Sequence, residues 1–182
     1  GAPHDGNCNP FFAVWAKPAN GRPFTRMLAG PLTEAEYSSN SGRGNGSNSP
    51  NFGLPRFQSA TFEAAYPFGV ANLASSNLPI RARVKGFNPF IPGDAEASGL
   101  PIAVLTYEIE NLTDAPMEVS VAGAMRNLAG EGGHAFLSSQ GFKGIYSSAD
   151  GQNSVCLGVA TDGKVSARLG CEKTRWNGEI LQ

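Results

Sequence analysis

The chain has 182 residues, of which 41% are hydrophobic and 16% charged, and its formal net charge is −1. This length favours one domain with a sizeable core, and 23 Gly and 13 Pro interrupt the chain too often for long helices, so the composition predicts an all-β fold. Scattered Lys and Arg residues argue against nucleic acid as a partner, and no apolar run reaches the roughly 20 residues of a membrane-spanning helix.

The N-terminal part of the sequence predicts a hairpin followed by a long polar loop. Apolar strands at residues 11–16 and 24–28 flank an Asn20-Gly21 turn. Residues 38–53 consist almost wholly of Ser, Asn and Gly, which is typical of a flexible loop that is mobile at the surface or covers a site. The sequence starts with Gly1 and not Met, which is typical of a residue left by tag removal, so removal of an export signal is an open alternative and the cellular compartment stays open.

Three further strands are expected before residue 90. Two of them lie within residues 57–70, with a bend at Pro67, and the third is a half-buried strand at residues 78–87. In this third strand, apolar side chains alternate with Arg81, Arg83 and Lys85. The three cations are candidate contacts for an acidic partner or a sugar, although a solvated sheet face is the more frequent explanation.

The segment at residues 88–94, NPFIPGD, places an apolar pair between two prolines. The prolines predict an extended path, and the side chains of Phe90 and Ile91 must be buried somewhere. Either the pair packs on its own domain, or it docks on another. Phe90 and Ile91 are therefore candidate domain-docking residues.

Residues 100–127 give the clearest pattern in the sequence and predict two strands of one antiparallel hairpin with a polar turn at residues 111–116. Each strand has an apolar face that should point into a core. The face of the first strand has Ala103, Leu105, Tyr107 and Ile109, and that of the second has Met117, Val119, Val121 and Gly123. Two strands are not stable by themselves, so further sheets should cover them.

The last third of the sequence predicts one or two strands around residues 136–146 and a hairpin at residues 155–171 with Asp162-Gly163 as its loop. This register makes Cys156 and Cys171 diagonal neighbours, about 7 to 8 Å apart at Cα, which is near the limit for a disulfide. Two buried free thiols are the preferred interpretation, and a disulfide is the alternative.

Few residues are suited to catalysis. Neither His4 nor His134 has a second His or a Cys at metal-ligand spacing, so no metal or other cofactor is expected. Glu108 and Glu110 lie two residues apart on one strand face, with Cα atoms about 6.5 to 7 Å apart, which is compatible with glycoside hydrolysis. We favour the interpretation that both are solvated charges on an outer strand face, because nothing nearby in the sequence would raise the pKa of one carboxyl and not of the other.

Four phrases occur in succession: ATFEAAYPF, FNPFIP, SGLPIAVLTYEIEN and PMEVSVAGAMRN. Together they resemble the N-terminal domain of family 116 glycoside hydrolases, the family of non-lysosomal glucosylceramidase. The resemblance covers about residues 11–161 and implies a two-layer antiparallel β-sandwich with long loops and little helix. In that family both catalytic carboxylates belong to a separate α-helical barrel, so the resemblance gives this chain no catalytic residue.

The resemblance further implies that residues 1–182 form a single β-sandwich domain, complete or truncated, without the helical catalytic domain. The expected role is non-catalytic support of that helical domain in a parent protein, with a glucoside or glycolipid at the domain boundary. The alternative is a free-standing carbohydrate-binding module, which needs exposed coplanar aromatic side chains such as those of Trp15, Tyr146 or Trp176. Catalysis by the chain alone would depend on Glu108 or Glu110 and is not expected.

Overall fold

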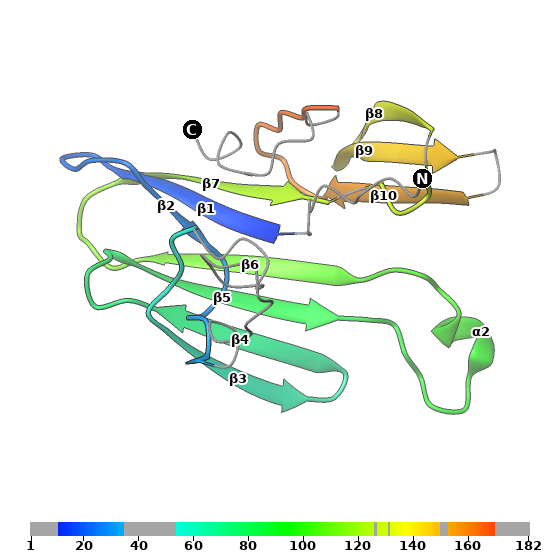
Figure 1. The fold of residues 1–182 in the computed structure, drawn as a ribbon, viewed down its shortest axis with the longest axis horizontal. Coiled ribbons are helices and arrows are strands. Elements are labelled where there is room, and N and C mark those ends of the chain that lie inside the picture. The colour runs from blue at the N-terminus through cyan, green and yellow to red at the C-terminus, as the bar shows by residue number, and fades with distance from the viewer. Residues whose placement is uncertain (1–10, 35–53, 126, 131, 150–152, 170–182) are drawn as a thin grey trace, which may run out of the picture. The chain divides into compact units, whose positions relative to one another are not determined.

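The computed structural model describes residues 11–34, 54–125, 127–130, 132–149 and 153–169. The elements in chain order are β1 (Phe11–Pro18), β2 (Phe24–Met27), β3 (Ser59–Ala65), β4 (Phe68–Ala74), β5 (Ile80–Phe87), α2 (Ala95–Ser98), β6 (Val104–Asn111), β7 (Met117–Ala124), β8 (Gly133–Ser139), β9 (Phe142–Ala149) and β10 (Asn153–Val159). Strands dominate and helix is scarce, so the predicted all-β class is confirmed (Figure 1). The chain divides into two compact units, one with β1 to β7 and one with β8 to β10. A single domain over residues 1–182 stays a prediction, and the polar loop at 38–53 lies outside the described residues.

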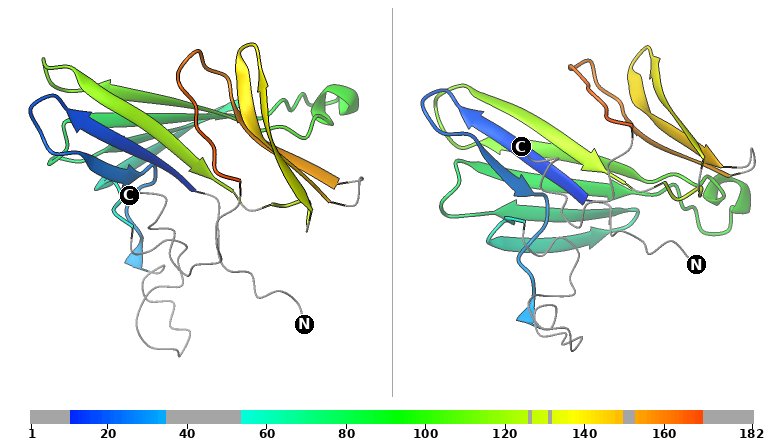
Figure 2. Two further views of the ribbon diagram at one scale, coloured as in Figure 1. Left: turned by 90° about the horizontal axis from the view of Figure 1, so that it is seen from above. Right: turned by 45° about the horizontal axis from the view of Figure 1, so that its top comes forward.

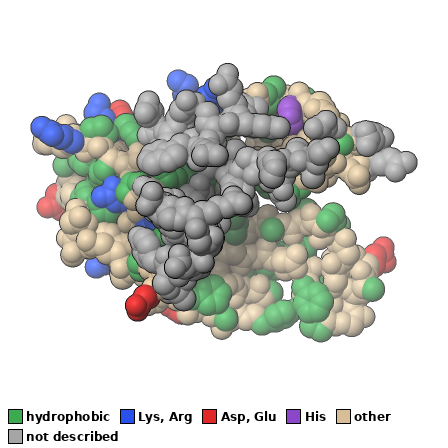
Figure 3. Space-filling model, in the orientation of Figure 1, with side chains coloured by type: hydrophobic (Ala, Val, Ile, Leu, Met, Phe, Trp, Pro, Cys, Tyr) green, Lys and Arg blue, Asp and Glu red, His purple; other side chains and the backbone are tan. Residues whose placement is uncertain are grey.

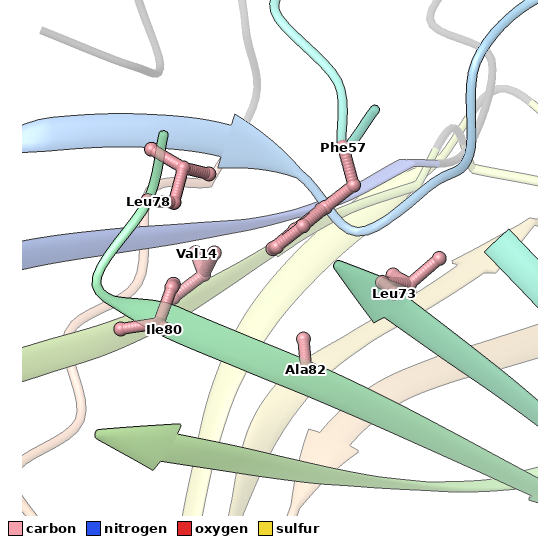
Figure 4. Packing of buried hydrophobic residues seen from close by; sticks show 6 residues of the cluster. All are labelled: Val14, Phe57, Leu73, Leu78, Ile80 and Ala82. Carbon is pink, nitrogen blue, oxygen red and sulfur yellow. The ribbon is translucent and has the colours of Figure 1, made fainter. Parts of the chain in front are cut away.

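The first unit is a two-layer antiparallel β-sandwich. One layer has the strand order β2-β1-β7 and the other the order β3-β4-β5-β6, and the two layers lie face to face in Figures 1 and 2. Buried apolar side chains from both layers and from the segments beside them form the core, namely Val14, Phe57, Leu73, Leu78, Ile80 and Ala82 (Figure 4). The sandwich implied by the family resemblance is thus present in the first unit.

Strand alternation decides which side chains enter this core. In β5, Ile80 and Ala82 are 0% and 3% exposed, whereas Arg81 and Arg83 are exposed to solvent. The half-buried strand predicted at residues 78–87 is therefore confirmed. The N-terminal hairpin is confirmed as well, because β1 and β2 pair antiparallel around a turn in which the Gly21 N–H donates to the Pro18 carbonyl over 3.2 Å.

The two strands predicted at residues 100–127 exist, but they do not form a hairpin. β6 pairs with β5 and β7 lies beside β1, so residues 112–116 cross from one layer to the other. Asn111 stabilises this corner, because its Nδ2 donates to the Ala115 carbonyl over 2.8 Å and its Oδ1 accepts from the Thr113 N–H over 3.0 Å. The hairpin prediction is wrong because alternation shows which face of a strand is apolar and does not show which strand lies beside it.

The apolar faces predicted for these two strands are buried only in part. Tyr107 and Ile109 are half-buried, and Ile109 and Met117 pack against the core. The large side chains that stay 40% to 43% exposed are Leu105, Val119 and Val121, and Ala103 is exposed too. β6 and β7 are edge strands of their sheets, so side chains on their inner faces have fewer neighbours than those on β1 or β5.

Tyr107 connects the two layers through the ring of Phe12. The two ring centroids are 5.2 Å apart, with an angle of 37° between the ring planes. Gly123 makes room for this contact, since a Cβ atom at that position would lie 2.6 Å from the Phe12 ring. Burial raises the pKa of Tyr107 above its ordinary value of 10.0, because the phenolate would lose solvation between the layers.

We expect Tyr107→Phe to reduce the loss of stability of this protein at alkaline pH. A phenol whose pKa is raised by folding keeps its proton in the native state while the unfolded chain loses its own, so the free energy of unfolding falls as pH rises above about 10. Urea unfolding at pH 8 and pH 11 measures this fall, which should be smaller in the variant than in the wild type. The two proteins should have the same pH dependence below pH 9, and equal losses at pH 11 would contradict the prediction.

The second unit contains a three-stranded antiparallel sheet with the order β10-β9-β8. A tight turn with Gly141 at a φ of 77° joins β8 to β9, and this confirms the strands predicted around residues 136–146. β10 pairs with β9, and residues 164–169 form no strand, so the predicted Asp162-Gly163 hairpin is wrong. A local turn is present there, in which Thr161 Oγ1 accepts from the Gly163 N–H over 3.0 Å.

The cysteine prediction can be compared with the structure at one position only. Cys156 faces Tyr146 across β9 and β10, and its thiol is free and exposed. The prediction that it is buried is wrong, and the hairpin on which that prediction was based does not form over the described residues 164–169. Cys171 lies outside the described residues, and the free thiol of Cys156 does not support the alternative of a disulfide between the two.

Candidate functional site

The outer face of the four-stranded sheet carries the three cations that the sequence marks as candidate contacts. Strand register places Arg83 opposite Glu108 and Arg81 opposite Glu110. Arg83 Nη1 lies 3.1 Å from Glu108 Oε2, and Arg81 Nη1 lies 3.8 Å from Glu110 Oε2. The cations and carboxylates that are far apart in the sequence thus neutralise one another across two strands.

Lys85 also has a partner within the sheet. Its Nζ atom lies 3.8 Å from the centroid of the Phe68 ring, a geometry in which the ring face attracts the ammonium group. Phe68 in turn packs on Phe87, with ring centroids 5.4 Å apart. All three candidate cations therefore have intramolecular partners, and their contact with a sugar or an acidic partner stays a prediction.

A shallow, open depression of about 520 Å³ lies over this outer face. Polar side chains from β3 and β4 line it together with the two ion pairs, and these are Ser59, Thr61 and Asn72. Asn72 Nδ2 donates to Glu63 Oε1 over 2.9 Å, so the amide is also bonded within the sheet. The depression therefore has little net charge, and its best donors and acceptors are already bonded to one another.

Glu108 and Glu110 lie on this exposed face. Their side chains are 52% and 62% exposed, and each carboxylate is bound to an arginine of the neighbouring strand. A glycosidase holds one carboxyl as an acid in an apolar setting while the other stays ionised, whereas both glutamates here are more than half exposed to solvent. The geometry fits two solvated cross-strand ion pairs, which contribute at most about 1 kcal/mol each to stability.

The loop between β5 and β6 presents an exposed apolar surface at the end of the same sheet. Phe90 and Ile91 are 53% and 52% exposed, so neither side chain is packed fully on its own unit. Tyr66, Leu100 and Ile102 are apolar neighbours with exposures of 67%, 53% and 50%. We call these five residues the apolar platform, and Figure 3 shows hydrophobic side chains gathered at this end of the molecule.

Two hydrogen bonds join the parts of the apolar platform that are distant in sequence. The Tyr66 phenol donates to the Phe90 carbonyl, which connects the turn before β4 to the loop. Asn88 Nδ2 donates to the Ile102 carbonyl over 3.1 Å, which connects the start of the loop to its end. The segments that carry Tyr66, Phe90 and Ile102 are consequently joined to one another.

The short helix α2 closes the loop between the two halves of the platform. Asp94 is its N-cap, with Oδ1 accepting from the Ala97 N–H over 2.9 Å. Ser98 Oγ accepts from the Ile91 N–H and donates to the Ile91 carbonyl, both over 2.9 Å. Sequence reasoning identified Phe90 and Ile91 but not these supporting residues, although Asp94 is a residue type that is favoured at a helix N-cap.

The other side chains considered from the sequence do not assemble into a site. Trp15 is half-buried in β1, Tyr146 is 37% exposed in the other unit, and Trp176 lies outside the described residues. His134 Nδ1 lies 2.8 Å from the Oγ atom of the buried Ser147. Within the described ranges, no three His, Cys, Asp or Glu side chains are arranged to hold a metal ion. The described part of the chain also contains no helix that is long and apolar enough to cross a membrane.

Comparison with protein-family models identifies one match over most of the chain. The matching model is described as beta-glucosidase 2, glycosyl-hydrolase family 116 N-term, and it covers residues 4–173. The match includes both compact units and every described strand.

Proposed function

The chain belongs to the N-terminal domain family of glycosyl-hydrolase family 116, and we propose that it is a non-catalytic β-sandwich domain that supports a separate helical catalytic domain. The parent protein would be a β-glucosidase-like or glucosylceramidase-like hydrolase. The observation that carries the proposal is the apolar platform, because it offers the docking surface that such a domain needs.

The exposure of the apolar platform supports docking. Each of its five side chains is at least half exposed, and several large exposed apolar side chains on joined segments are typical of a surface that binds a partner. The loop beneath it is fixed by the Ser98 and Asp94 hydrogen bonds, so little conformational entropy is lost when a partner covers it. A rigid apolar surface is what a permanent contact between domains requires.

The ion pairs on the outer sheet face support a non-catalytic role. Glu108 and Glu110 are bonded to arginines and open to solvent, and this geometry gives them no distinct acid and base roles. We place the catalytic carboxylates on the helical domain and a glucoside or glycolipid at the boundary between the two domains. The free-standing carbohydrate-binding module remains the alternative, and saturable binding of gluco-oligosaccharides to this chain would favour it.

The test is the double substitution Phe90→Ser and Ile91→Ser in the intact parent protein. Burying the exposed halves of two large apolar side chains contributes about 2 kcal/mol, so the variant should lose about that much docking free energy and unfold at a lower temperature. Calorimetry and β-glucosidase assays of the parent protein measure the two consequences. The isolated 182-residue chain should keep its unfolding midpoint, because both side chains already face solvent there.

Leu112→Ser is the matched control. Leu112 is 42% exposed and lies in the corner after β6, at the opposite end of the sandwich from the apolar platform. The control should leave the stability and activity of the parent protein unchanged. If the Phe90 and Ile91 variant also leaves both unchanged, the docking role is refuted.

A further inference from the structure

Two carboxylates lie beside the apolar platform without a cation in the same segment. Asp94 and Glu96 are both exposed, and residues 88–103 contain no Lys or Arg. Figure 3 shows acidic side chains next to the hydrophobic ones at the α2 end of the molecule. We call Asp94 and Glu96 the acidic rim.

The nearest strand cations do not compensate this charge. Arg81 and Arg83 are paired with Glu110 and Glu108, and Lys85 lies over the Phe68 ring. These partners hold the three cations on the outer sheet face, whereas the acidic rim belongs to the loop after β5. The apolar platform is therefore bordered by net negative charge.

From this arrangement we propose that the surface that covers the apolar platform is itself apolar at its centre and carries Lys or Arg side chains opposite Asp94 and Glu96. The proposal rests on the proposed function, and it commits to the helical catalytic domain of the parent protein as the occupant. Interfaces place apolar side chains at the centre and charged ones at the border, and like charges facing each other there cost several kcal/mol. A neutral or acidic partner surface would leave both carboxylates of the rim uncompensated.

A local role in α2 is the competing explanation for the acidic rim. Asp94 caps the helix and Glu96 lies in its first turn, where a carboxylate favours the helix N-terminus. Asn caps a helix about as well as Asp, so Asp94→Asn removes the charge and keeps the cap. Combined with Glu96→Gln, this change separates the charge of the rim from its helix-capping function.

The experiment uses one double variant that carries both Asp94→Asn and Glu96→Gln. Its stability is compared with that of the wild type, once in the intact parent protein and once in the isolated chain. At low ionic strength the parent variant should unfold roughly 1 to 3 °C below the wild type, and the difference should disappear in 0.5 M NaCl, because rim ion pairs are weak and screened. Glu96→Lys should enlarge the difference. The isolated chain should change less than the parent protein in each of these variants, since nothing covers the rim there and only the local effect of the charge on α2 remains.

Glu118→Gln is the control, because Glu118 is an exposed carboxylate at the start of β7, away from the apolar platform. It should leave the salt dependence of the parent protein unchanged. If the rim variants behave like this control while Phe90→Ser with Ile91→Ser still weakens docking, the cationic partner surface is refuted and the docking role stands. If the isolated chain is destabilised as much as the parent protein, the rim serves α2 alone and the proposal is wrong.

Discussion

Phe57→Ala should lower the free energy of unfolding of this protein by about 3 to 5 kcal/mol. The Phe57 side chain is 1% exposed and points from the segment before β3 into the core between the two layers (Figure 4). Removing the ring deletes its contacts with the core side chains from β1, β4 and β5, and it leaves a cavity that the two sheets can close only in part. The loss is a large fraction of the stability of a domain of this size.

Phe62→Ala is the matched control for that substitution. The chemical change is identical, but Phe62 is 72% exposed on the edge strand β3, so its loss should cost less than about 1 kcal/mol. Urea unfolding followed by far-ultraviolet circular dichroism gives both values from the shift in midpoint at unchanged slope. Equal shifts for the two variants would show that the layers are not packed around Phe57.

The sequence was sufficient to predict strands and their buried faces, but not which strands are neighbours. Alternation in β5 correctly placed Ile80 and Ala82 inside and the arginines outside. The same reasoning found β6 and β7 and wrongly paired them, because a short polar connection can serve a hairpin or a crossing between layers. The partner strands, β5 for β6 and β1 for β7, distinguish the two cases, and β1 lies at the opposite end of the first unit's sequence from β7.

The candidate sites were predictable to a similar degree. The sequence shows two cations two residues apart, Arg81 and Arg83, and elsewhere two carboxylates with the same spacing. That these groups form ion pairs with each other depends on the register between β5 and β6, which the sequence does not show. Phe90 and Ile91 were identified from their place between prolines. Tyr66 and Ile102 joined the platform only through the folding of a turn and a loop end against that segment, which no local pattern encodes.

Gly144 is a glycine that the sequence predicts to interrupt a strand, although the structure requires it inside β9. The sequence places Gly144 between Lys143 and Ile145 in a predicted strand, where a glycine ordinarily weakens the strand. In the sheet it lies within β9 directly opposite Gly158 of β10. A Cβ atom on Gly144 would be 2.7 Å from Gly158 Cα and 2.8 Å from the Leu157 carbonyl oxygen, both of which are backbone atoms. The backbone of β10 can lie this close to β9 because Gly144 has no side chain.

Gly144→Ala is therefore expected to destabilise the β8–β10 sheet by about 3 kcal/mol or more, since the backbone of β10 must move away from β9 to admit the methyl group. Amide hydrogen exchange should show the loss of protection in β9 and β10, and the unfolding midpoint of the chain should fall. Gly133→Ala, in β8 of the same sheet, is the control, because nothing lies within 4 Å of a Cβ atom there. It should be neutral or stabilising by up to about 1 kcal/mol, through the lower entropy of the unfolded chain. If both variants keep the protection of the wild type, β9 and β10 do not pair at Gly144 and Gly158 as closely as the structure shows.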